Sequence, residues 1–314
     1  MEKYIRSHDD ALIFYTYMPA DKKKPTLVFI HSIGSNWTVW KIEMAFFQRL
    51  GYPCLAFDLR AHGLSEVLPN DDQYFLPNFA KDLDAILTTE KIKNFILIGH
   101  SFGGGIAINY CGIFPKKLPK LLVLAETAYR YPFQHKKEFN MNPFIALFLR
   151  FLGEHQHFVN VHLPHLRELD FSTDFHRKQR SNLTILLEAL HVTPLRSILK
   201  CLDGLQKYSF DHLQDTERVL SRLPMPVLIV SGSEDKVVPL HFQEELHHLL
   251  KKSELKVITG AYHRIPIQNP EELCAELLHF FEKHSSLMHS GSVKKRKAKK
   301  SVTKKSTKKI AKKK

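Results

Sequence analysis

The sequence contains few cysteines and no long apolar run. Its four cysteines lie far apart, and no pair has C-x-x-C spacing. Cysteines in this pattern are typical of buried free thiols in a reducing compartment, so we expect a cytoplasmic protein. The longest apolar run, Phe144–Leu149, stops at Arg150 and is too short to span a bilayer. The first ten residues lack the apolar segment of a secretory signal, so we expect none.

Net charge is also nearly absent from most of the chain, although the formal total is +14. Of the 46 lysines and arginines, 13 lie in Lys294–Lys314, a segment without acidic residues. The rest of the chain carries 33 basic and 32 acidic residues. This balance argues against a nucleic-acid-binding surface on the globular part and assigns the basicity to the C-terminal segment.

The order of apolar segments predicts an α/β fold. With 314 residues, 44% of them hydrophobic, the chain can form one large α/β domain. Short apolar runs alternate with segments of helical spacing, which predicts a mostly parallel, doubly wound sheet with helices on both faces. The expected strands are Ala11–Met18, Pro25–Ile30, Tyr52–Phe57, Phe95–Ile98, Lys120–Ala125, Pro226–Val230 and Leu255–Thr259.

The alternation stops near Ala128. From Tyr129 to Leu223 the chain is helical in pattern, aromatic and rich in histidine, so we expect a helical cap inserted at residues 129–223. Asn269–Lys283 has the pattern of a closing amphipathic helix. The expected organisation is one domain over residues 1–288 and a Lys-rich tail, predicted to be disordered, over residues 289–314.

The segment Asn94–Cys111 contains a G-x-S-x-G motif between an apolar strand pattern and a helix. This order is required for a nucleophile elbow, in which a strand reverses into a helix within two residues. The reversal would strain the backbone of Ser101 and bring Gly99 and Gly103 too close together for side chains. It would also hold the serine hydroxyl at a helix N-terminus, which favours a developing anion.

A serine nucleophile needs a base, and the base needs an acid that orients it. Asp235 follows the apolar run Pro226–Val230, and His263 follows Leu255–Thr259. Because parallel strands end at one edge of a sheet, Ser101, Asp235 and His263 should meet there.

Several motifs together resemble the α/β-hydrolase fold superfamily, and the resemblance covers about Tyr4 to Lys283. The matching segments, in chain order, are His31-Ser32-Ile33-Gly34, Asp58 to Ser65, the elbow, Gly232 to Pro239, and His263 followed by Pro270. The sequence departs from the family pattern at Ser32, Ala61, Tyr262 and Gln268, and these departures affect pocket shape more than triad chemistry.

The resemblance implies a serine hydrolase with Ser101 as nucleophile, His263 as base and Asp235 as acid. It places the oxyanion hole at the backbone amides of Ile33 and Phe102, and the substrate pocket at His31, Ser32 and His100. The implied reaction is hydrolysis of a carboxylic ester or related small acyl substrate, without a cofactor. C–C bond hydrolysis or acyl transfer by the same triad remains open, as does a non-catalytic ligand-binding or scaffold protein.

Other polar residues have simpler interpretations. Glu234 and Glu126 are alternative acids, although Asp235 fits the motif offset better. Asp58, Arg60 and His62 are expected to stabilise a turn. Four histidines, at 155, 157, 162 and 165, match no known metal-ligand spacing, so we expect no metal site. The Lys294–Lys314 segment is either a solubilising appendage or a tether to nucleic acid or an anionic membrane.

Overall fold

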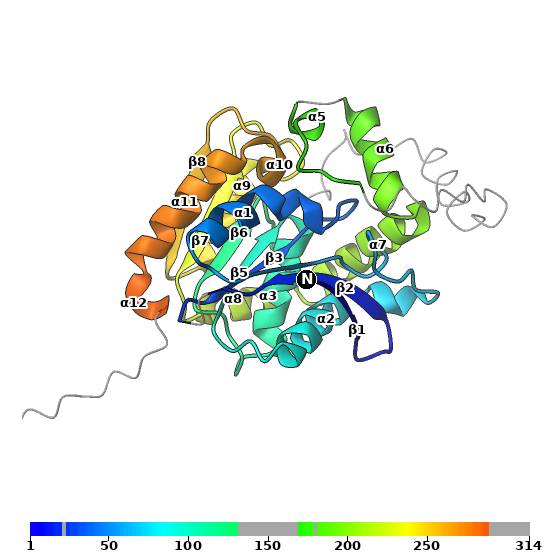
Figure 1. The fold of residues 1–314 in the computed structure, drawn as a ribbon, viewed down its shortest axis with the longest axis horizontal. Helices are drawn as coiled ribbons and strands as arrows, with labels where there is room; N and C mark the ends of the chain where they lie inside the picture. Colours follow the sequence, from blue (N-terminus) through cyan, green and yellow to red (C-terminus); the bar gives the residue numbers. More distant parts are fainter. Residues whose placement is uncertain (21–22, 131–168, 179–180, 289–314) are drawn as a thin grey trace, which may run out of the picture.

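An eight-stranded sheet organises the chain in the computed structural model, which describes residues 1–20, 23–130, 169–178 and 181–288 (Figure 1). The strand order is β1-β2-β4-β3-β5-β6-β7-β8. The strands are β1 (Glu2–Arg6), β2 (Leu12–Met18), β3 (Thr26–Ile30), β4 (Cys54–Phe57), β5 (Phe95–His100), β6 (Leu122–Ala125), β7 (Val227–Gly232) and β8 (Ser253–Ile258). From β4 to β8 all neighbours are parallel, while β1 and β2 pair antiparallel at one edge. The predicted α/β fold with a mostly parallel sheet is confirmed.

The sequence prediction missed only β1 among these strands. Its residues alternate between exposed and half-buried positions, and it pairs only with β2. A short edge strand of this kind has no continuous apolar run, so the pattern that identified the buried strands does not apply to it.

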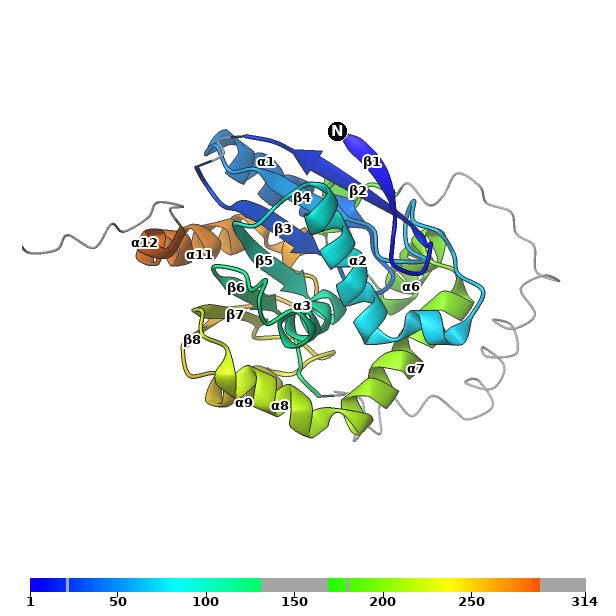
Figure 2. The same ribbon diagram turned by 90° about the horizontal axis from the view of Figure 1, so that it is seen from below.

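Two apolar cores lie on the two faces of the sheet, because successive side chains of a strand point to opposite faces. In β3, Leu27 and Phe29 pack into one core, and Val28 and Ile30 into the other. The first face is covered by α1 (Lys41–Arg49) and α11 (Pro270–Lys283). The second face is covered by α2 (Leu76–Thr89), α3 (Phe102–Ile113), α8 (Leu213–Arg222) and α9 (Leu240–Leu249) (Figure 2).

Among the residues that the structure describes, four helices lie between β6 and β7. They are α5 (Asp174–Arg177), α6 (Asn182–Val192), α7 (Leu195–Asp211) and α8. Pro194 lies between α6 and α7. The helix α8 packs on α3, so this end of the inserted segment joins the layer that covers the sheet. Residues 131–168 of the predicted cap, including the apolar run 144–152 and the four clustered histidines, lie outside the described residues.

The remaining short helices connect these elements. They are the 3₁₀ helices η1 (Trp37–Trp40) and η2 (Asp71–Tyr74), and the single turns α10 (Ile265–Gln268) and α12 (Ser285–Met288). The 3₁₀ helix η1 continues directly into α1. Asn269 occupies the N-cap position of α11, but its side chain makes no capping hydrogen bond.

The turn after β4 is stabilised as the sequence predicted. The Asp58 carboxylate accepts hydrogen bonds from the backbone amides of Trp37 and Leu64, both at 2.8 Å. The buried Arg60 forms a bidentate pair with the buried Asp82 of α2, with nitrogen–oxygen distances of 2.6 and 2.8 Å. These contacts attach the loop after β4 to the helices on both sides of the sheet.

The sequence also predicts that the cysteines are buried free thiols and that no apolar run is long enough to span a membrane. All four cysteines are buried free thiols, as expected. Across the described ranges, every helix is too short or too polar to traverse a lipid bilayer.

A buried acid on α1 gives a testable pH dependence. Glu43 is fully buried, and neither carboxylate oxygen has a hydrogen-bond partner among the residues that the structure describes. Burial away from water raises the pKa of Glu43 well above its ordinary value. At pH values between its unfolded and folded pKa, the folded chain keeps a proton that the unfolded chain releases. The free energy of unfolding therefore falls as pH rises, by up to about 1.4 kcal/mol per pH unit.

A glutamine side chain does not titrate. The free energy of unfolding of the Glu43→Gln variant should therefore decline less steeply with rising pH than that of the wild type above pH 4.5. Urea unfolding between pH 4.5 and 8 measures the difference. The exposed Glu244→Gln substitution on α9 serves as the control and should keep the wild-type slope. Equal slopes for the Glu43→Gln variant and the wild type would contradict the prediction.

Candidate active site

Ser101 lies on a sharp turn between β5 and α3. Its φ of 53° and ψ of −114° are unusual for a residue with a side chain. The backbone amide of Ser101 donates to the carbonyl of Ala125 at 2.8 Å, which anchors the turn to β6. Ser101 therefore has the strained backbone that the nucleophile-elbow motif predicts.

Two glycines make this turn possible. A Cβ atom on Gly99 would lie 2.5 Å from the carbonyl oxygen of Gly103, which no side chain can tolerate. A Cβ atom on Gly103 would collide with the carbonyl groups of Ile30 and His31 at the end of β3. The first obstacle is the one that the sequence predicted, and the second shows that α3 also begins directly against β3.

His263 connects Ser101 with Asp235 at the carboxyl edge of the sheet. Its Nε2 lies 3.0 Å from the Oγ of Ser101, and its Nδ1 lies 2.8 Å from Oδ2 of Asp235. Asp235 follows β7 and His263 follows β8, so three segments far apart in sequence meet here. With the proton on Nδ1 donated to the carboxylate, Nε2 can accept the serine proton.

The Asp235 carboxylate has a complete set of partners. Its Oδ1 accepts from the backbone amides of Val237 and Val238 at 2.8 and 2.9 Å, and its side chain is buried. Donors on both oxygens hold the carboxylate in one orientation toward the imidazole. Glu234, the neighbouring candidate acid, is exposed.

Glu126 and His100 lie behind the loop that carries His263. Nε2 of His100 is 2.8 Å from Oε2 of Glu126 and 3.0 Å from the backbone carbonyl of His263. Burial lowers the pKa of His100 to about 4, so its neutral ring can donate from Nε2. Burial also raises the pKa of Glu126 well above its ordinary value. The imidazole of His263 bonds to Asp235, whereas Glu126 reaches the backbone of this loop through His100 and through the amide of Ile265 at 3.2 Å.

In the described part of the chain, two groups of side chains have enough ligand atoms within 4.8 Å of one another to consider a metal ion. The first contains His100, Glu126 and His263, but both ring nitrogens of His263 already contact Asp235 and Ser101. A metal there would compete with the serine contact.

The second group contains His8, Asp9 and Asp82, and Arg60 already pairs with both of its carboxylates. In both groups, side chains that could bind a metal ion already form hydrogen bonds or ion pairs with other residues.

A cavity of about 210 Å³ adjoins Ser101. Ser32, Ile33 and Phe102 are among the residues that line it. The residues that sequence analysis did not identify here are Gly105, Ala128, Arg130, Leu202, Leu205, Val237 and Val238. Leu202 and Leu205 come from α7, about a hundred residues after the nucleophile, and nothing in their local sequence indicates this position.

His31 and His100, which the sequence predicts for the substrate pocket, are not among the residues that line this cavity. His31 is fully buried, and its Nε2 accepts from the backbone amide of Leu59 at 3.0 Å. His100 is directed toward Glu126, as described above. Both histidines hydrogen-bond to the backbone of loops around the site.

Comparisons with known proteins agree with this architecture. A family model described as the alpha/beta hydrolase fold matches residues 25–270. Mouse protein ABHD8 is 26% identical over 258 residues, which cover 81% of this chain and 54% of ABHD8. The chain thus spans about half the length of this relative. The AB hydrolase superfamily protein YisY of Bacillus subtilis is 24% identical over 89% of this chain and 99% of its own length.

Solved structures have the same fold. An esterase from Exiguobacterium antarcticum superposes with a TM-score of 0.69 at 19% identity, covering 90% of this chain and all of that protein. Since the family model matches well over half of the chain and the sheet order agrees with it, this protein belongs to the alpha/beta hydrolase fold family.

Proposed function

We propose that the protein is a serine hydrolase that cleaves a carboxylic ester or a related acyl substrate. The observation that carries the proposal is the continuous contact from the Ser101 hydroxyl through His263 to Asp235. This is the arrangement by which a weak hydroxyl nucleophile is activated at neutral pH. The esterase among the structural neighbours adds support at the level of the reaction class.

In this mechanism the Ser101 oxygen attacks the acyl carbon while His263 takes its proton on Nε2. Asp235 holds the Nδ1 proton and stabilises the imidazolium ion that forms. The oxyanion would accept hydrogen bonds from the backbone amides of Phe102, the first residue of α3, and Ile33. Such donors each lower the barrier by roughly 3–4 kcal/mol. His263 then returns the proton to the leaving group, and water releases the acyl group from Ser101 in a second round.

The Ser101→Ala variant removes the nucleophile and should stay folded, because an alanine side chain is smaller. Turnover of p-nitrophenyl acetate should fall by roughly 10⁴- to 10⁶-fold, and labelling by a fluorophosphonate probe should disappear. Ser286→Ala, at an exposed serine of α12, is the control and should retain both signals. Labelling that persists in the Ser101→Ala variant would reject Ser101 as the nucleophile. A wild-type chain that neither reacts with the probe nor cleaves esters would instead support a ligand-binding or scaffold role.

The Asp235→Asn variant tests the acid. An amide at this position favours the wrong tautomer of His263, so kcat should fall by roughly 10⁴-fold while the fold is kept. The neighbouring substitution Glu234→Gln removes an exposed carboxylate and should change kcat less than twofold. If Glu126→Gln were to cause the large loss while Asp235→Asn did not, the acid would be Glu126. Stopped-flow ester hydrolysis across pH 6–9 distinguishes these cases.

The basic segment Lys294–Lys314 lies outside the described residues, and we propose that it tethers the enzyme to a polyanion. The supporting observation is its 13 positive charges, in contrast to the near neutrality of the preceding chain. Such a segment binds phosphates with an affinity that falls steeply with salt.

A chain ending at Ser292 should therefore lose retention on heparin and on DNA-cellulose at low salt. Hydrolysis of p-nitrophenyl acetate should remain within twofold of the full-length value. Binding to vesicles with 30% phosphatidylserine in the same two chains separates a membrane target from a nucleic-acid target. Heparin retention that survives the truncation would refute the tether.

A further inference from the structure

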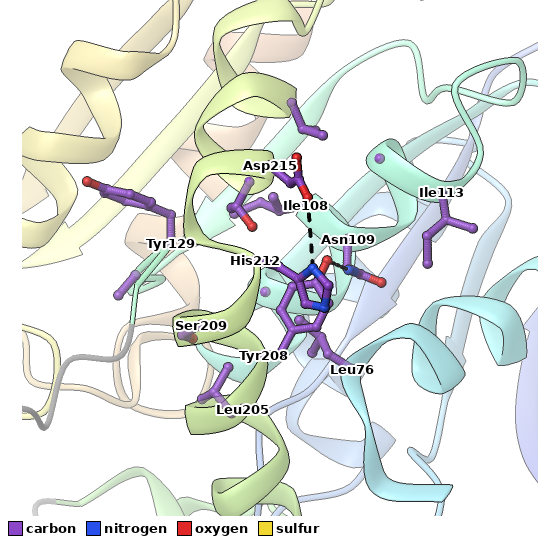
Figure 3. A pocket seen from close by; sticks show the side chains of 15 residues that line it. Leu76, Ile108, Asn109, Ile113, Tyr129, Leu205, Tyr208, Ser209, His212 and Asp215 are labelled. Carbon is purple, nitrogen blue, oxygen red and sulfur yellow. Dashed lines mark hydrogen bonds and ion pairs between the residues drawn. The ribbon is translucent and has the colours of Figure 1, made fainter. Parts of the chain in front are cut away.

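A second cavity, of about 220 Å³, lies between α3, α7 and α8 (Figure 3). Its wall on α3 consists of residues spaced by three or four positions, which places them on one side of that helix. These residues are Gly105, Ile108, Asn109 and Gly112. The same helical stripe begins one turn earlier at Ser101. The cavity therefore extends along α3 away from the proposed nucleophile.

The opposite wall has a matching stripe on α7 and α8. Leu205, Tyr208, Ser209 and His212 project from α7 and its end, as Figure 3 shows, and Thr216 and Val219 follow on α8. We call this space between the two stripes the α3–α7 compartment. Its inner part is apolar, formed by Leu76, Ile108, Leu205 and Val219.

The compartment and the cavity beside Ser101 share three wall residues, Gly105, Ala128 and Leu205. Two of these have little or no side chain, so the partition between the cavities is thin. A Cβ atom built on Gly105 meets no atom within 4 Å, whereas one on Gly104 would collide with Thr127. Gly105 therefore leaves open space at the boundary, and a rotation of the Leu205 side chain would connect the two cavities.

The outer end of the compartment is polar and open to solvent. His212 and Asp215 lie there with a nitrogen–oxygen distance of 3.9 Å and exposed side chains. Asn109 is buried farther inside; it donates to the hydroxyl group of Tyr208, and its own buried Oδ1 has no partner among the described residues. A bound ligand would thus contact leucine, isoleucine and valine side chains along its middle. Its end would reach water or a hydrogen-bonding side chain.

We propose that the α3–α7 compartment receives the distal part of the substrate's acyl group, which passes Gly105 on its way from Ser101. This inference rests on the proposed serine hydrolase function and adds the substrate class: esters of medium-chain or phenylalkyl carboxylic acids. An engineered apolar cavity of about 150 Å³ binds benzene, so this compartment is large enough for a phenyl ring or an alkyl segment of about six carbons. Each methylene that leaves water should raise kcat/KM about fourfold until the compartment is full.

The test is a series of p-nitrophenyl esters from acetate to decanoate. For the wild type, kcat/KM should rise with chain length to about octanoate. In the Gly105→Leu variant, whose side chain would fill the open boundary, the octanoate-to-acetate ratio of kcat/KM should fall at least tenfold. Gly105→Ala is the matched control, because it makes the same change in helix propensity with a single carbon, and it should keep the ratio within about twofold.

A second variant, on the α8 wall of the compartment, tests the same proposal in case the Gly105→Leu variant does not fold. Val219→Phe adds volume inside the compartment without touching the cavity beside Ser101, and it should lower the octanoate-to-butyrate ratio at least fivefold. Unchanged ratios in both folded variants, or a wild-type preference for acetate, would overturn the acyl assignment. Chain-length preference confined to the alcohol portion of acetate esters would overturn it as well.

The two proposals fail differently in these experiments. If no ester is turned over and the fluorophosphonate probe does not react, the hydrolase proposal fails and the acyl compartment falls with it. If short esters are cleaved by a Ser101-dependent reaction while the ratios stay constant, only the acyl compartment is rejected.

Discussion

The close approach of α3 to the ends of β3 and β5 is the constraint on which the rest of the site depends. It is possible only because Gly99 and Gly103 present no side chains where the backbones meet. The approach forces Ser101 into a strained conformation, which the hydrogen bond from its amide to Ala125 on β6 maintains. The strain has a direct consequence, since it directs the serine side chain away from the sheet and toward the loop after β8.

A second layer of contacts holds that loop in place. His100, the residue before Ser101, bonds to the backbone of His263 and to the buried Glu126. On its other side, Arg264 bonds to Glu188 of α6 at 3.0 Å, and Glu188 also contacts His176 of α5 at 2.8 Å. The position of the imidazole is thus coupled both to the elbow and to the helices inserted after β6. The same inserted helix reaches the segment after β3, where a Cβ atom on Gly34 would lie 2.6 Å from that of Ala189.

The inserted helices also help to form the walls of the two cavities near Ser101. Helix α7 contributes Leu205 to both cavities, and α8 packs on α3 to form the outer wall of the α3–α7 compartment. In the proposed function, catalysis and specificity are therefore assigned to different parts of the chain. The sheet edge positions Ser101, His263 and Asp235, and the surface between α3 and the inserted helices borders the cavities beside them.

The sequence by itself determined the sheet, the elbow and the order of the three polar groups, because each has a local signal. Buried parallel strands are continuous apolar runs, and a strand that reverses into a helix needs glycine at fixed offsets from Ser101. The orientation of His31 and His100 and the participation of Leu202 and Leu205 were decided only in the tertiary structure. These properties depend on which side chain fills a space between elements that are distant in sequence. The periodicity and spacing of residues along the chain do not indicate which side chain that is.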